Sequence, residues 1–167
     1  MKTLNYLKTM SLLAVTLAFT SCDKDSVAEA NPTIDLAAEE ISFSVDKTSQ
    51  FSGMATIKGT LTNIADDYIS DQGQQTLFLY ERQLGVNQGT IVAQKSFTNL
   101  ASGDSVEVSF SRAWNASSPA EGEFPPEYTI LISYDPDIFL DSNKNNDDIN
   151  NTNNQLMKSG MDINDLF

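Results

Sequence analysis

The chain has 167 residues, no histidine, one cysteine and a formal net charge of −13. Without histidine, the sequence excludes Ser-His-Asp and Cys-His catalytic arrangements, histidine-ligated zinc and histidine as a general base. The acidic surplus argues against nucleic acid as a partner, because phosphate backbones carry charge of the same sign. A single cysteine forms no disulfide within the chain, so the fold must depend on burial or on a metal.

Residues 1–21 have the order of an export signal. Lys2 and Lys8 give a basic start, residues 10–19 form an apolar run, and Thr20-Ser21 are small. The apolar run is too short to span a bilayer, which favours a cleaved signal over the alternative of a buried N-terminal helix. Because residues 1–21 hold two lysines and no acid, their removal leaves 146 residues with a net charge of −15, enough for one domain and a tether.

Cys22 directly follows this signal and resembles the lipobox cysteine of bacterial lipoproteins. In that family the cysteine thiol carries a diacylglycerol, and signal peptidase II cuts the chain directly before the cysteine. The sequence departs from the usual pattern at Phe19, where leucine is common. The alternative is an unpaired reactive thiol in an exported protein. Lipidation at Cys22 predicts anchoring to the bacterial cell envelope by acyl chains such as palmitate, each buried CH₂ contributing about 0.8 kcal/mol.

Residues 22–39 are polar and acidic and lack a sustained period, which predicts a flexible tether. Asp23-Lys24-Asp25 resembles the acidic signal that sends lipoproteins of some Gram-negative lineages to the outer face of the outer membrane. In other lineages an aspartate directly after the cysteine is associated with the inner membrane, and the third alternative is a solvated charge run. We expect the outer membrane, with the cell surface as its exposed side.

The domain predicted for residues 40–154 contains strand-like runs with period-2 alternation. They cover residues 41–45, 55–62, 74–80, 90–97, 106–110 and 127–137. In the last run Tyr128, Ile130 and Ile132 share one face, and Pro125-Pro126 exclude a helix before it. Short strands separated by turns predict an all-β, immunoglobulin-like antiparallel β-sandwich. Residues 155–167 form a weak last strand or a tail, and within them residues 161–167 form either a short docking turn or a frayed end. Gly53 and Gly59 mark a bulge or bend.

Several turn and strand motifs occur in the order found in the CARDB-type domain, an immunoglobulin-like module named for its association with bacterial cell adhesion. They are Thr62-Asn63-Ile64-Ala65, Leu79-Tyr80, Leu100-Ala101-Ser102-Gly103-Asp104-Ser105, Tyr128-Thr129-Ile130, Asp135-Pro136-Asp137, and a closing pair at Asn145-Asn146 or Asn153-Asn154. The chain is similar to this family over about residues 41–154. Ala65 departs from the family's turn glycine, and Ile138 from its asparagine. The resemblance implies the fold and an adhesion-related role, and it implies no activity.

The Asn/Asp-rich stretch after the last long strand is a candidate calcium site. Its oxygen ligands are Asp135, Asp137, Asp141, Asn143, Asn145 and Asp147. Asp141, Asn143 and Asn145 have the spacing of the first three ligands of a calcium loop, whereas Thr152 stands where a bidentate glutamate is expected. Asn and Asp also close turns on their own backbone, so a metal-free turn is the alternative. Ca²⁺ is the only cofactor that the sequence suggests.

Two long loops, residues 115–126 and 135–154, are the candidate contact surfaces, because binding on a rigid sandwich usually lies in its loops. The candidate binding residues are Trp114, Asn115 and Phe124, although for Trp114 packing in the core or at its rim is favoured over contact with a ligand. Tyr128 is a candidate tyrosine corner, its hydroxyl bonded to nearby backbone.

No G-x-S-x-G, P-loop or dinucleotide motif occurs, so we expect no enzyme. We predict a lipid-anchored envelope module for binding or adhesion, attached to the membrane by its lipid and bound to a protein or glycan partner. The alternative is a structural accessory subunit of a secretion, uptake or motility assembly. An apolar patch on one sheet would favour the assembly, and exposed aromatics on the loops would favour a ligand.

Overall fold

The computed structural model describes residues 30–133 and 141–167, and Asn31–Phe167 form one compact unit. Its strands are β1 (Leu36–Lys47), β2 (Ser52–Asn63), β3 (Tyr68–Ile69), β4 (Gln75–Arg82), β5 (Thr90–Phe97), β6 (Asn99–Leu100), β7 (Ser105–Asn115), β8 (Glu127–Ile132) and β9 (Gln155–Ser159). The helical turns are η1 (Pro119–Glu123), η2 (Asn151–Asn153) and α2 (Met161–Asn164).

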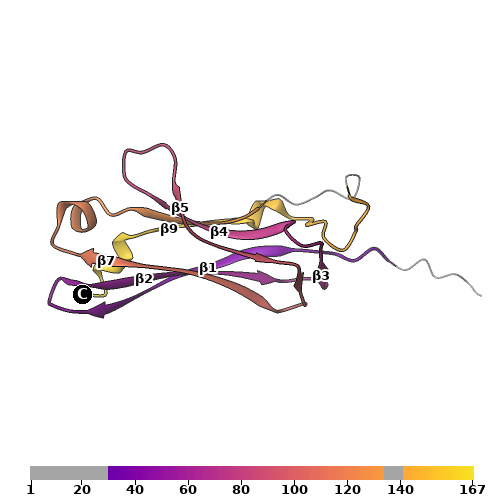
Figure 1. Ribbon diagram of the computed structural model, residues 1–167, viewed down its shortest axis with the longest axis horizontal. Helices are drawn as coiled ribbons and strands as arrows, with labels where there is room; N and C mark the ends of the chain where they lie inside the picture. Colours follow the sequence, from indigo (N-terminus) through magenta and orange to yellow (C-terminus); the bar gives the residue numbers. More distant parts are fainter. Residues whose placement is uncertain (1–29, 134–140) are drawn as a thin grey trace, which may run out of the picture. The chain divides into compact units, whose positions relative to one another are not determined.

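Two antiparallel sheets face each other (Figure 1). One has the order β1-β2-β7 and the other the order β5-β4-β8-β9, while β3 and β6 form a small separate pair. The chain crosses between the two sheets after β2, after β5 and after β7, as in a Greek key. The two main sheets therefore have three and four antiparallel strands, as in an immunoglobulin-like sandwich. The predicted all-β antiparallel sandwich is therefore confirmed.

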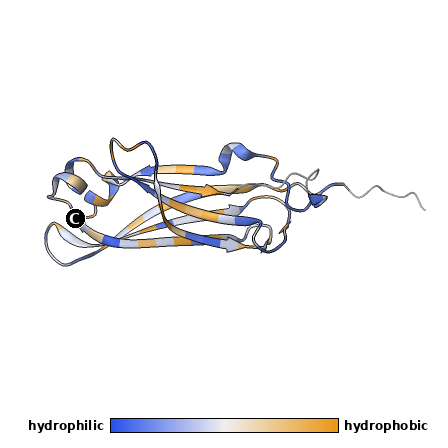
Figure 2. Cartoon of the chain, turned by 45° about the horizontal axis from the view of Figure 1, so that its top comes forward, coloured by the Kyte–Doolittle hydropathy of each residue, from blue (hydrophilic) through white to orange (hydrophobic). Residues whose placement is uncertain are grey.

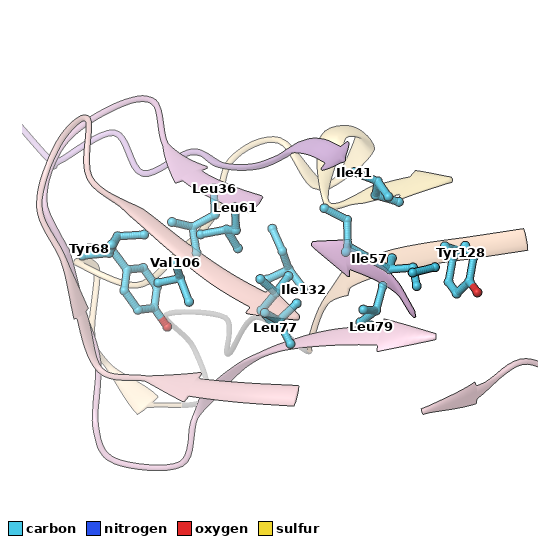
Figure 3. Close-up of a cluster of buried hydrophobic side chains, with 14 of the residues drawn as sticks. Leu36, Ile41, Ile57, Leu61, Tyr68, Leu77, Leu79, Val106, Tyr128 and Ile132 are labelled. Atoms are coloured by element: carbon cyan, nitrogen blue, oxygen red, sulfur yellow. The ribbon is translucent and has the colours of Figure 1, made fainter. Parts of the chain in front are cut away.

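Alternation along the strands builds the core. In β2, Ala55, Ile57 and Leu61 are fully buried, and in β8, Tyr128 and Ile130 are fully buried. Figure 2 shows hydrophobic and hydrophilic residues alternating along the strands, and Figure 3 shows the buried side chains meeting between the sheets. A slip of one residue in the strand pairing would turn the whole apolar row of a strand toward solvent. The alternation therefore fixes the register of the strands.

Gly59 on β2 packs closely against β8 of the facing sheet. A Cβ added to it would be 2.2 Å from Cγ2 of Ile130 on β8. Its pairing is regular, with Ile41 and Val108 as neighbours, so the predicted bulge at this glycine is wrong. The register shifts lie in β1 between Ala38 and Glu40 and at the β4–β5 pair. Glycine is needed at this position for packing.

The domain begins before the predicted boundary at residue 40. β1 starts at Leu36, and Ile34 and Leu36 have no exposed surface. Ile34 forms a parallel bridge with Asp148, and the backbone N–H of Ile149 donates to the Ile34 carbonyl at 3.0 Å. The C-terminal end of the predicted tether therefore belongs to the sandwich. The predicted signal and Cys22 lie outside the described residues.

The C-terminal segment forms a strand and a helical turn, so the alternative of a frayed tail is wrong. β9 pairs with β8, Leu156 lying opposite Ile130. Ile163 in α2 is fully buried, and the Trp114 indole N–H donates to Oδ1 of Asn164 at 2.8 Å. These contacts fix α2 against the end of β7.

Candidate functional site

The outer face of the β1-β2-β7 sheet is mostly polar, with Met54 (46% exposed) as its one large apolar side chain. Thr56 and Thr62 of β2 are hydrogen-bonded to Ser111 and Ser105 of β7, each at 2.8 Å between hydroxyl oxygens. Nζ of Lys58 donates to the Glu107 carboxylate at 2.7 Å. Cross-strand pairs of this kind stabilise a solvated sheet surface.

The outer face of the β5-β4-β8-β9 sheet is different. It carries five large apolar or aromatic side chains, which together we call the apolar face: Phe78, Tyr80, Ile91, Leu131 and Met157. The Phe78 and Tyr80 ring centroids are 6.0 Å apart, and Ile91 and Met157 keep 47% and 51% of their surface exposed. The strand register aligns Tyr80, Thr129 and Met157 across three strands. Contiguous exposed apolar surface marks contact sites on soluble domains.

A first hollow of about 350 Å³ lies on the apolar face beneath the loop that joins β4 to β5. Tyr80, Leu131 and Met157 line it from the sheet, and Asn87 and Gln88 line it from the loop. Figure 1 shows this loop standing away from the sheet. The loop and the sheet therefore form two walls of an open, largely preformed hollow.

A second hollow of about 320 Å³ lies between the same loop and the segment that leads into β8. Its lining includes Leu84, Phe124 and Met161, which are 67%, 53% and 43% exposed. Arg82 lines both hollows and forms an ion pair with Glu127, so this pair marks the border between them. The two hollows make one apolar track with an ion pair in its middle.

Of the three predicted binding residues, Phe124 lies in the second hollow, and Trp114 and Asn115 line a separate hollow of about 330 Å³. Trp114 is 2% exposed and packs under the Arg112 guanidinium, whose Cζ lies 5.5 Å from the centroid of the Trp114 ring, which agrees with the alternative of core packing. Asn115 accepts hydrogen bonds from the backbone N–H and hydroxyl of Ser117, at 3.0 and 2.7 Å. Asn115 therefore closes a turn before η1.

A half-buried charged network is centred on Arg112 of β7. The Arg112 guanidinium contacts Glu81 at 3.0 Å and Glu121 at 2.7 Å, and the Tyr128 hydroxyl donates to Glu81 at 2.8 Å. Burial, together with the nearby Glu81 charge, raises the pKa of Tyr128. The predicted tyrosine corner is wrong, because the partner of Tyr128 is a carboxylate on β4. The network joins β4, β7, η1 and β8.

In the candidate calcium loop, side-chain oxygens accept hydrogen bonds from backbone N–H groups two residues later and so form a series of turns. Asp141 accepts the backbone N–H of Asn143 at 2.8 Å, and Asn143 accepts that of Asn145 at 3.0 Å. The buried Asn146 amide donates to Asp141 at 2.8 Å, and this bond is the main cause of the lowered pKa of Asp141. The structure thus brings Asp141, Asn143 and Asn145 into one series of turns.

Of the other three predicted calcium ligands, one lies within the described residues and two lie outside them. Asp147 is half-buried, while Asp135 and Asp137 lie outside the described residues. Within residues 30–133 and 141–167, no group of three or more His, Cys, Asp or Glu side chains is arranged to hold a metal ion. Asn and Asp turns satisfy the backbone of this loop without a cation.

Comparisons with protein-family models, with curated proteins and with solved structures gave no match. Within the part of the chain that the structure describes, no helix is long and apolar enough to cross a bilayer. The sequence alone does not predict the hollows, because their residues come together only through the pairing of β4, β8 and β9. Alternation within a strand predicts only which of its residues point outward.

Proposed function

We propose that this protein is a non-catalytic binding module of the bacterial envelope, held by a lipid on Cys22, and that it docks a protein partner through the apolar face. The observation that carries the proposal is the exposure of Ile91 and Met157 beside Phe78 and Tyr80, on a chain of net charge −13. The net charge keeps such a domain soluble, whereas an exposed apolar patch only lowers solubility, so the patch needs another reason. The absence of histidine from the sequence supports a role without catalysis.

The arrangement of the sandwich supports the same proposal. In Figure 1, the start of the described chain lies at the end with β3, and the β4–β5 loop and η1 lie toward the opposite end. A lipid at Cys22 would therefore join the domain at the end remote from the second hollow. The resemblance to CARDB-type modules agrees with an adhesion-related role.

A second candidate function is that of an accessory subunit in an envelope assembly for secretion, uptake or motility. It is favoured by the position of the apolar residues, since Phe78, Leu131 and Met157 lie together on a sheet face. By contrast, the exposed loop aromatics of the described residues, Phe51 and Phe124, lie in two different loops. Permanent interfaces are more apolar than transient ones. The two functions differ in whether the partner remains bound when the envelope is dissolved.

Site-specific photo-crosslinking in the native envelope tests the proposal. A photoreactive residue at Met157 should give a discrete adduct with a partner, and one at exposed Ser44, on the polar sheet, should give none. Equal adducts at both positions, or none at Met157, would refute docking through the apolar face. A partner that purifies with the protein in detergent at fixed stoichiometry would favour the assembly subunit. Cys22→Ala should release the protein from membranes, and retention after a salt wash would refute the lipid anchor.

A further inference from the structure

We propose that the two hollows together bind an extended segment of another protein, which inserts an apolar side chain into each hollow and places a basic residue beside Glu123. This inference rests on the proposed docking function and names the chemistry of the partner. It concerns the track defined by the two hollows on either side of the Arg82–Glu127 ion pair.

The apolar part of the partner follows from the walls of the hollows. Leu131 and Met157 lie in the first, and Leu84 and Met161 lie in the second. Aliphatic and thioether side chains bind apolar side chains and adapt to their shape. Each hollow also has one aromatic ring, Tyr80 or Phe124, at its wall. Burial of one large side chain in each hollow supplies most of the affinity that such a contact needs.

The extended conformation follows from the amides. Asn87, Gln88 and Gln155 line the first hollow, and within the described residues their side chains form no hydrogen bond with the protein. Each amide offers both donors and an acceptor. An extended peptide presents free backbone N–H and C=O groups to such amides, whereas the backbone groups of a helix are bonded to one another.

The basic residue follows from the charges. Three charged side chains line the hollows: Arg82, Glu127 and Glu123. Arg82 is paired with Glu127, and Glu123 has no ion-pair partner among the described residues. A cation of the partner beside Phe124 would therefore meet an unpaired carboxylate on an acidic domain, which favours basic over acidic segments and speeds association.

Binding of short fluorescent peptides to the full-length protein, purified from membranes into nanodiscs, tests the inference by anisotropy. The peptides share one length and no helix-forming pattern. The first combines Phe and Leu with Lys, the second combines them with Glu, and the third combines Ser and Gly with Lys. A neutral oligosaccharide serves as a competitor. We expect the first peptide to bind at least tenfold more tightly than the other two, and the oligosaccharide to displace nothing.

Matched variants locate the binding. Leu84→Ser combined with Phe124→Ser should weaken the first peptide by about tenfold or more, because both side chains are more than half exposed and their loss leaves the core intact. Ile64→Ser is the control, since Ile64 is 56% exposed and lines neither hollow. Glu123→Gln should weaken the basic peptide severalfold, and Asp104→Asn, the same charge change in a distant turn, should not.

Several outcomes would overturn the inference. Equal binding of all basic peptides would show attraction by charge alone, and displacement by the oligosaccharide would show a saccharide site. Self-association of the protein in sedimentation, abolished by the Leu84 and Phe124 changes, would make a second copy the occupant. If Met157 crosslinks a partner and no peptide binds, the inference fails while the proposed function stands. If peptides bind and Met157 gives no adduct, the proposed docking function fails.

Discussion

Replacing Arg112 by methionine removes the only cation from a network of two carboxylates and a phenol. Arg112, Glu81 and Glu121 keep only 24%, 14% and 15% of their side-chain surface exposed. Removing one partner from a fully buried ion pair costs about 3–5 kcal/mol. Because some solvent reaches this network, we expect Arg112→Met to lower the free energy of unfolding by about 2–4 kcal/mol. For a domain of this size, that corresponds to a fall in Tm of roughly 8–16 °C.

Urea unfolding, followed by circular dichroism and by the fluorescence of Trp114, measures this loss. Trp114 is the only tryptophan and lies against Arg112, so it reports directly on the network. Lys58→Met, which breaks an exposed pair on the polar sheet, is the control and should cost much less. Adding Glu81→Gln to Arg112→Met should restore part of the stability, because it removes an uncompensated charge. A loss below about 1 kcal/mol, or a double variant no more stable than Arg112→Met, would refute the reasoning.

Three further predictions concern the rest of the sandwich. Gly59→Ala should destabilise the domain by about 1–3 kcal/mol in urea unfolding, because its Cβ would meet Ile130; an unchanged midpoint would contradict this. Burial raises the pKa of Asp148 in the folded state, so its contribution to stability falls as pH rises from the unfolded pKa through the folded pKa. Asp148→Asn should therefore be more stable than the native protein at neutral pH, the difference vanishing near the unfolded pKa; a difference that grows on acidification would contradict this. If the Asn/Asp-rich loop binds Ca²⁺, millimolar Ca²⁺ should raise the Tm relative to chelator in the native protein and not in Asp141→Asn, and identical melting curves would end that hypothesis.

The sequence predicts the central strands well and the terminal segments poorly, for a physical reason. In β2 and β8, Ile57, Leu61 and Ile130 belong to long alternating rows that only a half-buried strand explains. Ile34 and Leu36 are isolated apolar residues in an acidic stretch, so their burial depends on a partner more than a hundred residues away at Asp148. Strand β9 is half exposed along its length, which leaves it little pattern of its own.

The same limit applies at the site. The sequence leaves Trp114 between core packing and ligand contact, because its partner Asn164 lies fifty residues later, in a segment that the sequence leaves between a docking turn and a frayed end. Phe124 is expected in a contact loop because Pro125-Pro126 directly follow it and exclude a continuing helix. The structure places Phe124 in the lining of the second hollow. Alternation predicts that Tyr80 and Leu131 point outward, yet only the sheet order brings them together with Met157 on β9.

The contrast between the two outer faces is the strongest guide to function, because the fold does not require it. Both sheets present their outer faces to solvent, and the β1-β2-β7 sheet covers its own with paired hydroxyls and the Lys58–Glu107 pair. The same polar solution was open to β4, β8 and β9, where Tyr80 and Met157 stand instead. Apolar side chains in water add nothing to the stability of the sandwich and raise the risk of aggregation. On the β1-β2-β7 sheet, Met54 is the one large apolar side chain exposed on the outer face, whereas the apolar face gathers five such side chains, and this difference is what the proposed docking of a partner would account for.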